Sequence, residues 1–130
     1  MQASGNALYK DGPEAVVEKY MKGFAHAMTQ SNYSFIEPYL RSGSNIAKMQ
    51  QAYVKKNIAE SLDSYEIVDV KYLSNEQCHV TTRETYYVQI EGKPLKLLTQ
   101  QCKYNLVKDS SGWLMTDFAE NVKVLSNIHQ

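Results

Sequence analysis

The spacing of apolar residues changes once along this chain, from a helical period to a strand period, near residue 63. Between residues 13 and 30 the apolar positions recur every three or four residues, which is typical of an amphipathic helix. Pro13 and Glu14 suit the first turn, because proline is tolerated there and a carboxylate complements the helix dipole. The apolar positions of this predicted helix are Val16, Val17, Tyr20, Met21, Phe24, Ala27 and Met28.

Two further helices are predicted before the period changes. The apolar segment 35–40, closed by Gly43, predicts a brief second helix that tolerates Pro38 only in its first turn or as a break. Ser44 suits the N-cap of a third helix, whose inner stripe would be Ile46, Met49, Tyr53, Ile58 and Leu62. The polar residues between them are assigned to a solvated face: Lys48, Gln50, Gln51, Lys55, Lys56 and Glu60.

After Asp63 the apolar positions alternate with polar ones, which predicts strands over 64–73, 77–90, 95–107 and 113–119, the last extended by "NVKVL". The segments "EGKP" and "KDSSG" are typical of the turns between them. Helices followed by an antiparallel meander indicate the α+β class. We therefore expect three N-terminal helices packed on a curved antiparallel sheet of four or more strands, with Trp113 in the core.

One carboxylate falls on the apolar face of the second predicted strand. Glu84 shares that face with Val80, Thr82, Tyr86 and Val88, although an unpaired buried charge costs several kcal/mol. Pairing about the "EGKP" turn sets Glu84 opposite Gln100 or Cys102, so we expect it to line a concave cavity and to bond Gln100 or a tyrosine. The residues predicted to line this cavity are Thr82, Glu84, Tyr86, Gln100, Tyr104 and Asp117.

Composition excludes several function classes. Lys+Arg 14 against Asp+Glu 14 gives a net charge near zero, without the basic face of a nucleic-acid binder. The histidines and cysteines lack metal-ligand spacing, and no cofactor motif is present. In the register above, Cys78 and Cys102 lie about 13 Å apart along the ladder, too far for a disulfide. We expect two free thiols, no metal and no cofactor.

Four stretches of the sequence resemble the nuclear transport factor 2-like fold, also called the cystatin-like cone. They are "EAVVEKYMKGFAHAMTQSNYSFIEPYL", the predicted third helix, "TTRETYYV" and "CKYNLVKDSSGWLMTDF". The resemblance covers residues 13–122, which makes 1–12 a linker and 123–130 a C-terminal tail or strand extension. No apolar run reaches the roughly 18 residues that span a bilayer.

More narrowly, "E-x-Y" on the second strand and "Y-x-L-x-K-D-x-S-G-W-x-M-x-D-F" are similar to the C-terminal extracytoplasmic domain of TcaA/YvbJ-like proteins of Gram-positive bacteria. Those proteins cross the membrane once and carry a cytoplasmic zinc ribbon. The resemblance implies a non-catalytic binding or sensing domain of the cell envelope, excised from its N-terminal anchor. Its expected partners are a small molecule, a cell-wall fragment or an envelope protein; homodimerisation stays open.

The alternative is a small SnoaL-like enzyme of the cyclase, dehydratase or isomerase type, acting on an apolar carbonyl-bearing substrate. Such enzymes place a carboxylate with a His or Tyr inside the cone as acid and base. Here strand parity turns His79 outward, so the usual carboxylate–histidine pair is not assembled. We therefore predict that the chain is not an enzyme.

Overall fold

The computed structural model describes residues 11–129, so most of the predicted linker, 1–10, lies outside the described residues. In the described part, two α-helices precede a five-stranded antiparallel sheet. The helices are α2 (Pro13–Gln30) and α3 (Asn45–Val54), with the 3-10 turns η1 (Tyr33–Phe35) and η2 (Glu37–Tyr39) between them. The strands are β1 (Ala59–Ser74), β2 (Gln77–Gln89), β3 (Lys96–Asp109), β4 (Gly112–Phe118) and β5 (Lys123–His129).

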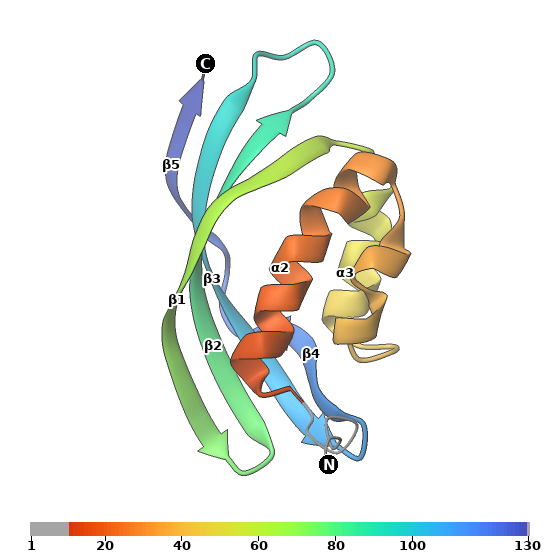
Figure 1. The fold of residues 1–130 in the computed structure, drawn as a ribbon, viewed down its shortest axis with the longest axis vertical. Coiled ribbons are helices and arrows are strands. Elements are labelled where there is room, and N and C mark those ends of the chain that lie inside the picture. The colour runs from red at the N-terminus through yellow and green to blue at the C-terminus, as the bar shows by residue number, and fades with distance from the viewer. Residues whose placement is uncertain (1–10, 130) are drawn as a thin grey trace, which may run out of the picture.

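Both helices lie on the same face of the curved sheet (Figure 1). The apolar stripe of α2 is buried against that face, where Val17 and Met21 meet strand residues such as Leu106 and Met115 in one core. Trp113 belongs to the same core and is 8% exposed, which confirms its predicted position. Burial between the helices and one sheet face is therefore the main source of stability.

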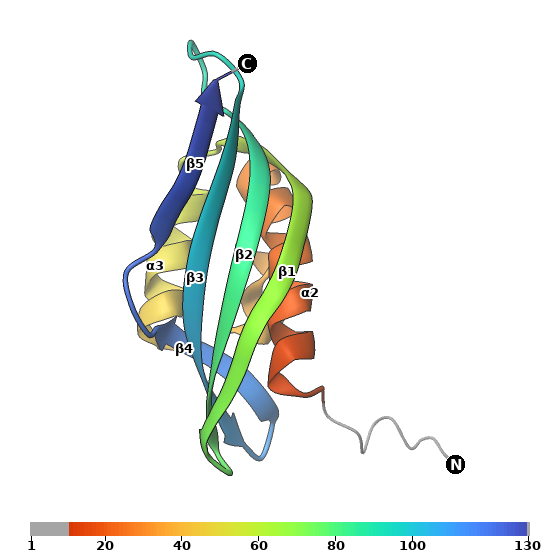
Figure 2. The same cartoon turned by 90° about the vertical axis from the view of Figure 1, so that its left-hand side faces the viewer.

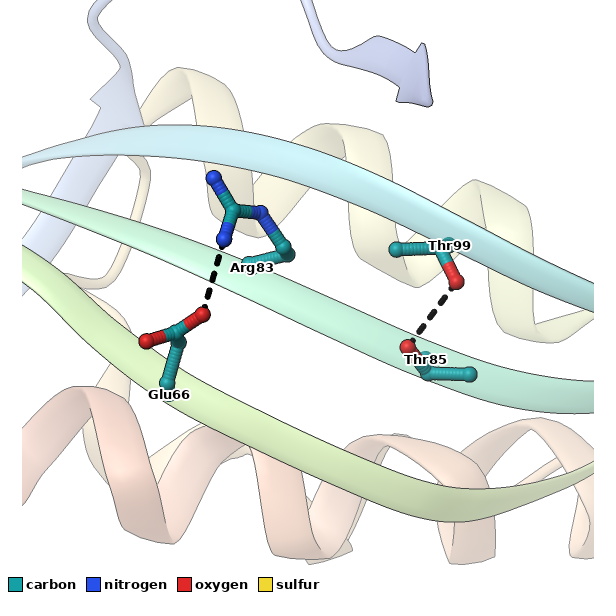
Figure 3. A network of polar contacts seen from close by, with 4 residues as sticks. All are labelled: Glu66, Arg83, Thr85 and Thr99. Atoms are coloured by element: carbon teal, nitrogen blue, oxygen red, sulfur yellow. Dashed lines mark hydrogen bonds and ion pairs between the residues drawn. The ribbon is translucent and has the colours of Figure 1, made fainter. Parts of the chain in front are cut away.

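The opposite face of the sheet is not covered by helices (Figure 2). It carries polar contacts between neighbouring strands. Arg83 of β2 forms an ion pair with Glu66 of β1, in which Nη1 and Oε1 lie 2.8 Å apart. The hydroxyls of Thr85 and Thr99 lie 3.0 Å apart on β2 and β3 (Figure 3). Such exposed pairs stabilise a fold by at most about 1 kcal/mol.

The predicted second helix is wrong. The chain there makes two separate 3-10 turns, the second with Pro38 in its first positions, because proline cannot continue a helix past its first turn. The segment packs closely on α2: a Cβ placed on Gly23 would lie 2.5 Å from the backbone oxygen of Phe35. Two α-helices, not three, therefore cover the described sheet.

The third predicted helix is real but shorter than expected. It is capped by Ser44, whose Oγ accepts a hydrogen bond from Ala47 N at 3.2 Å. It ends at Val54, and the left-handed backbone of Asn57, with φ 54°, redirects the chain into β1. Leu62 of the predicted inner stripe is therefore a strand residue, and Met49 is 52% exposed.

The predicted register of the central hairpin is confirmed. Glu84 pairs with Gln100, Cys78 with Leu106 and Cys102 with Thr82. Both cysteines are free and buried, as the register argument predicted. Period-two alternation fixes which side chains reach the core here, because a slip of one residue would turn every side chain to the opposite face.

A β-bulge alters the register at the end of β4. Asp117 pairs with Asn105, but Met115 pairs with Leu106, so Thr116 is the extra residue. The bulge brings Phe118, instead of Asp117, opposite Tyr104 on the inner face. β5 does not extend β4; it pairs separately with Lys96–Gln101 of β3.

Candidate functional site

Glu84 lies at the centre of a closed network of hydroxyl groups. Its carboxylate accepts hydrogen bonds from Tyr86 Oη at 2.8 Å, from Tyr104 Oη at 2.6 Å and from Thr82 Oγ1 at 2.5 Å. The side chain is 1% exposed. Three donors to one carboxylate replace much of the hydration that burial removes, which explains how the apolar face tolerates this acid.

The network holds its donors in their protonated form. Burial, reinforced by the negative charge of Glu84, raises the pKa of Tyr86 and Tyr104 well above the usual tyrosine value. The same two causes, in the same order, raise the pKa of the Cys102 thiol. These groups remain neutral donors at physiological pH, so they cannot supply a phenolate or thiolate nucleophile.

A cavity of about 220 Å³ adjoins this network, between the helices and the inner face of the sheet. Tyr86 belongs to both, since its ring lines the cavity while its hydroxyl bonds Glu84. Glu84 itself is not among the lining residues. The residues that line the cavity are Phe24, Met49, Gln50, Tyr53, Glu60, Tyr86, Leu98, Gln100, Phe118 and Val122.

Glu60, near the start of β1, is the acid that lines this cavity. Burial and, after it, the negative charge of Glu84 raise the pKa of its carboxyl to about 7, and Lys96 partly opposes both effects. In the described residues, no hydrogen bond or ion pair to this carboxylate is present. A carboxyl group with a pKa near neutrality beside a cavity is a recognised property of functional sites.

The six predicted site residues do not all meet at one place. Thr82, Glu84, Tyr86 and Tyr104 form the buried network, whereas Gln100 donates from Nε2 to Cys102 Sγ at 3.6 Å and lines the cavity. Asp117 lies apart from both groups. Its Oδ2 accepts a hydrogen bond from Asn45 Nδ2 at 3.1 Å, at the first residue of α3.

Asp117 instead lines a second hollow, of about 390 Å³, formed with residues 118–122 and Met49. Met49, Phe118 and Val122 line both spaces. The two spaces therefore lie next to each other, with these three residues between them.

Of the ten residues that line the cavity, only Tyr86 and Gln100 were among the predicted site residues, and the polar residues that were missed are Gln50 and Glu60. Both were assigned to the solvated face of a long third helix, but Gln50 is 6% exposed and donates from Nε2 to Tyr20 Oη at 2.7 Å. Glu60 belongs to a strand. The left-handed turn at Asn57 was the available signal, because asparagine tolerates that backbone better than most residues.

Among residues 11–129, no three His, Cys, Asp or Glu side chains come together as a metal site. Neither described helix combines the length and the apolar character that crossing a bilayer requires.

Solved structures share this fold at low sequence identity. The intermembrane space region of the chloroplast protein ARC6 matches with a TM-score of 0.69 and 14% identity, over 93% of this chain and 98% of that one. A protein from Novosphingobium aromaticivorans named after scytalone dehydratase matches with a TM-score of 0.64 and 8% identity, over 99% and 92%. A ketosteroid isomerase-like protein from Erwinia carotovora atroseptica matches with a TM-score of 0.56 and 16% identity, over 86% and 95%.

At these identities the likeness establishes the fold alone, and the same fold serves binding domains and enzymes. No curated protein matches the chain. The family comparison is more specific, because the model of the TcaA protein NTF2-like domain matches residues 9–119. That range includes both helices, the Glu84 network and all of β4. This chain therefore belongs to the family of TcaA protein NTF2-like domains.

Proposed function

We propose that this chain is a non-catalytic binding domain on the extracytoplasmic side of a membrane-anchored cell-envelope protein, and that its ligand enters the cavity beside Tyr86. Membership of the TcaA protein NTF2-like family supports this placement. One observation carries the non-catalytic part. The strand carboxylate, Glu84, is enclosed by three hydroxyl donors and does not line the cavity, so a bound molecule does not reach it.

The size and lining of the cavity support ligand binding. Its volume of about 220 Å³ is below the roughly 300 Å³ at which pockets for drug-sized ligands begin. It therefore suits a small molecule or one end of a larger one. Its lining is mostly apolar and aromatic with a few polar groups, the usual composition of a binding site.

The binding part is tested by NMR titration of the isotope-labelled domain with small aromatic probes. We expect shifts confined to amides near the cavity, such as those of Leu98 and Gln100, with the outer-face residues Thr85 and Thr99 unmoved. Shifts spread evenly over the sheet, or none at all, would contradict the proposal.

The location is tested on the parent protein in intact cells. Protease added outside protoplasts should remove this domain without lysis, while a cytoplasmic marker protein survives. Digestion only after lysis would place the domain in the cytoplasm and overturn this part of the proposal. The gene of the parent protein should also encode, ahead of this domain, a transmembrane segment and paired CxxC motifs.

A second candidate function is a small SnoaL-like enzyme, and one observation favours it. The Glu60 carboxyl has a pKa of about 7, suited to a general base at neutral pH, and it lines the cavity with Tyr53 and Tyr86. It would take a proton from the carbon beside a substrate carbonyl, leaving an enolate that regains a proton at the same carbon.

This second function predicts a simple exchange reaction. Cyclic ketones incubated with the domain in heavy water would gain deuterium beside the carbonyl, and Glu60→Gln would abolish the gain. On the non-catalytic proposal, we expect the wild-type domain to show no more deuterium exchange than Glu60→Gln. Exchange that depends on Glu60 would make the enzyme the better description.

A further inference from the structure

The cavity that the proposed function assigns to a ligand has a marked imbalance of charge. One of its ten lining residues, Glu60, is acidic, and none of these described residues is Lys, Arg or His. A second negative charge, that of Glu84, lies close enough to raise the pKa of Glu60. These two negative charges, only partly offset by Lys96, make the cavity disfavour an anion and favour a positively charged group.

Its hydrogen-bonding groups show the same imbalance. The amide nitrogens of Gln50 and Gln100 are directed at Tyr20 Oη and Cys102 Sγ, and in residues 11–129 no hydrogen bond reaches the side-chain oxygen of either glutamine. The hydroxyl of Tyr86 is already committed to Glu84. The polar groups left to the cavity are two amide oxygens and the Glu60 carboxylate, which accept, and the Tyr53 hydroxyl, which can accept or donate. An ammonium group, with three donors and no acceptor, complements such a set.

Aromatic rings supply the remaining wall. Phe24, Tyr53, Tyr86 and Phe118 line the cavity, and aromatic rings attract cations through the negative potential of their faces. The Tyr53 ring already has one such neighbour, since Lys56 Nζ lies 5.2 Å from its centroid. Lys56 is not itself a lining residue, so its charge does not occupy the cavity.

From these three properties we infer that the cavity binds a protonated amine, with the ammonium group at Glu60 and the hydrocarbon part against the aromatic rings. This inference rests on the proposed binding function and specifies its ligand class.

Binding of a cation should also release a proton. Around Glu60 lie Glu84 on β2, Lys96 on β3 and Tyr53 on α3, and the carboxyl has a pKa of about 7. An ammonium group stabilises the ionised carboxylate and lowers this pKa, so amine binding tightens as the pH rises through about 7. A neutral ligand has no such dependence.

The experiment compares three probes of nearly equal size: benzylamine, benzyl alcohol and benzoate, titrated by NMR into the labelled domain at about pH 8. We expect benzylamine to bind about two- to fivefold more tightly than benzyl alcohol, the size of one exposed cation–π or ion-pair contact. Benzoate should bind more weakly than either.

The matched variants are Glu60→Gln and Glu66→Gln. Both remove one negative charge from β1, but Glu66 pairs with Arg83 on the outer face (Figure 3). Glu60→Gln should abolish the preference for the amine over benzyl alcohol, whereas Glu66→Gln should bind all three probes like the wild type. The spectrum of each free variant verifies that it is folded.

The outcomes separate the two proposals. Equal binding of amine and alcohol, or a preference that survives Glu60→Gln, overturns the amine inference and leaves cavity binding intact. If no probe shifts the cavity resonances, the amine inference and the proposed binding function both fail. An amine preference that grows from about pH 6 to 8 in the wild type, and is absent in Glu60→Gln, supports the inference.

Discussion

Tyr104 donates a hydrogen bond of 2.6 Å to the carboxylate of Glu84, although the ladder pairs Tyr104 with Val80 and Glu84 with Gln100. The phenol therefore reaches along the inner face to a residue four positions away on the neighbouring strand. This diagonal contact ties β2 to β3 through side chains as well as through the backbone. Its loss should be measurable.

We expect Tyr104→Phe to lower the free energy of unfolding by about 1–3 kcal/mol, because the buried carboxylate loses one of its three donors. Urea denaturation followed by circular dichroism measures the change. Tyr87→Phe is the matched control: Tyr87 is exposed on the outer face, and no hydrogen bond of its hydroxyl is found in the described structure. Equal stability of the two variants would mean that the carboxylate does not depend on Tyr104.

The raised pKa of Glu60 predicts how stability depends on pH. Folding raises this pKa from 4.5 to about 7, so between those values the folded protein holds a proton that the unfolded chain releases. Stability should therefore be greater at the acid end of this window and fall as the pH rises through it.

Urea midpoints measured at about pH 5 and pH 7 for the wild type and for Glu60→Gln isolate this contribution. The variant should show a smaller fall between the two pH values. Glu66→Gln should follow the wild type, because its carboxylate lies in an exposed pair. A fall of the same size in Glu60→Gln would assign the pH dependence to other groups.

Trp113→Ala should destabilise the fold by about 3–5 kcal/mol, since it removes a large buried side chain and leaves a cavity. Trp113 packs edge-to-face on Tyr72 with ring centroids 5.9 Å apart. Thermal denaturation with a two-state fit measures the effect. A loss below about 1 kcal/mol would show that β4 contributes little to the core.

The two thiols should be unreactive in the folded protein. Cys78 and Cys102 are buried and free, and burial raises the pKa of both, so little thiolate is present or accessible. We expect slow modification by a thiol reagent in native buffer and rapid modification of both in urea. Mass spectrometry of the denatured protein, alkylated without reduction, checks the pairing. A disulfide would leave both cysteines unalkylated and the chain two hydrogens lighter than its reduced form.

The sequence predicted those parts of the fold where one periodicity held without interruption. Along β2 and β3 the period of two placed Glu84 opposite Gln100 or Cys102, of which Gln100 is the partner found, and it turned both cysteines inward. The sequence did not decide the hydrogen-bond partner of Glu84, because both Gln100 and a tyrosine were within its reach. Side-chain length decided it: the phenols extend to the carboxylate, and Gln100 bonds Cys102 instead.

The periodicity failed where two structures share the same spacing. Ile58 and Leu62 lie four residues apart, which suits one face of a helix and one face of a strand equally well. The third helix was therefore extended too far, and Glu60 was assigned to solvent. At Asp117 the alternation itself was interrupted by the bulge at Thr116, and a bulge leaves no reliable mark in a single sequence.

That bulge also allows the cavity wall at the end of β4 to change separately from the Glu84 network on β2 and β3. The insertion or loss of one residue at the end of β4 would change which side chain lines the cavity there, which in this chain is Phe118. The Glu84 network draws its donors from β2 and β3, so such a change removes none of these donors, although it alters the ring that packs 5.3 Å from the ring of Tyr104. Related domains can therefore diversify the shape and chemistry of the cavity wall while they keep the same inner polar support. Mutational libraries aimed at new ligands should begin at Thr116–Phe118 and spare Glu84.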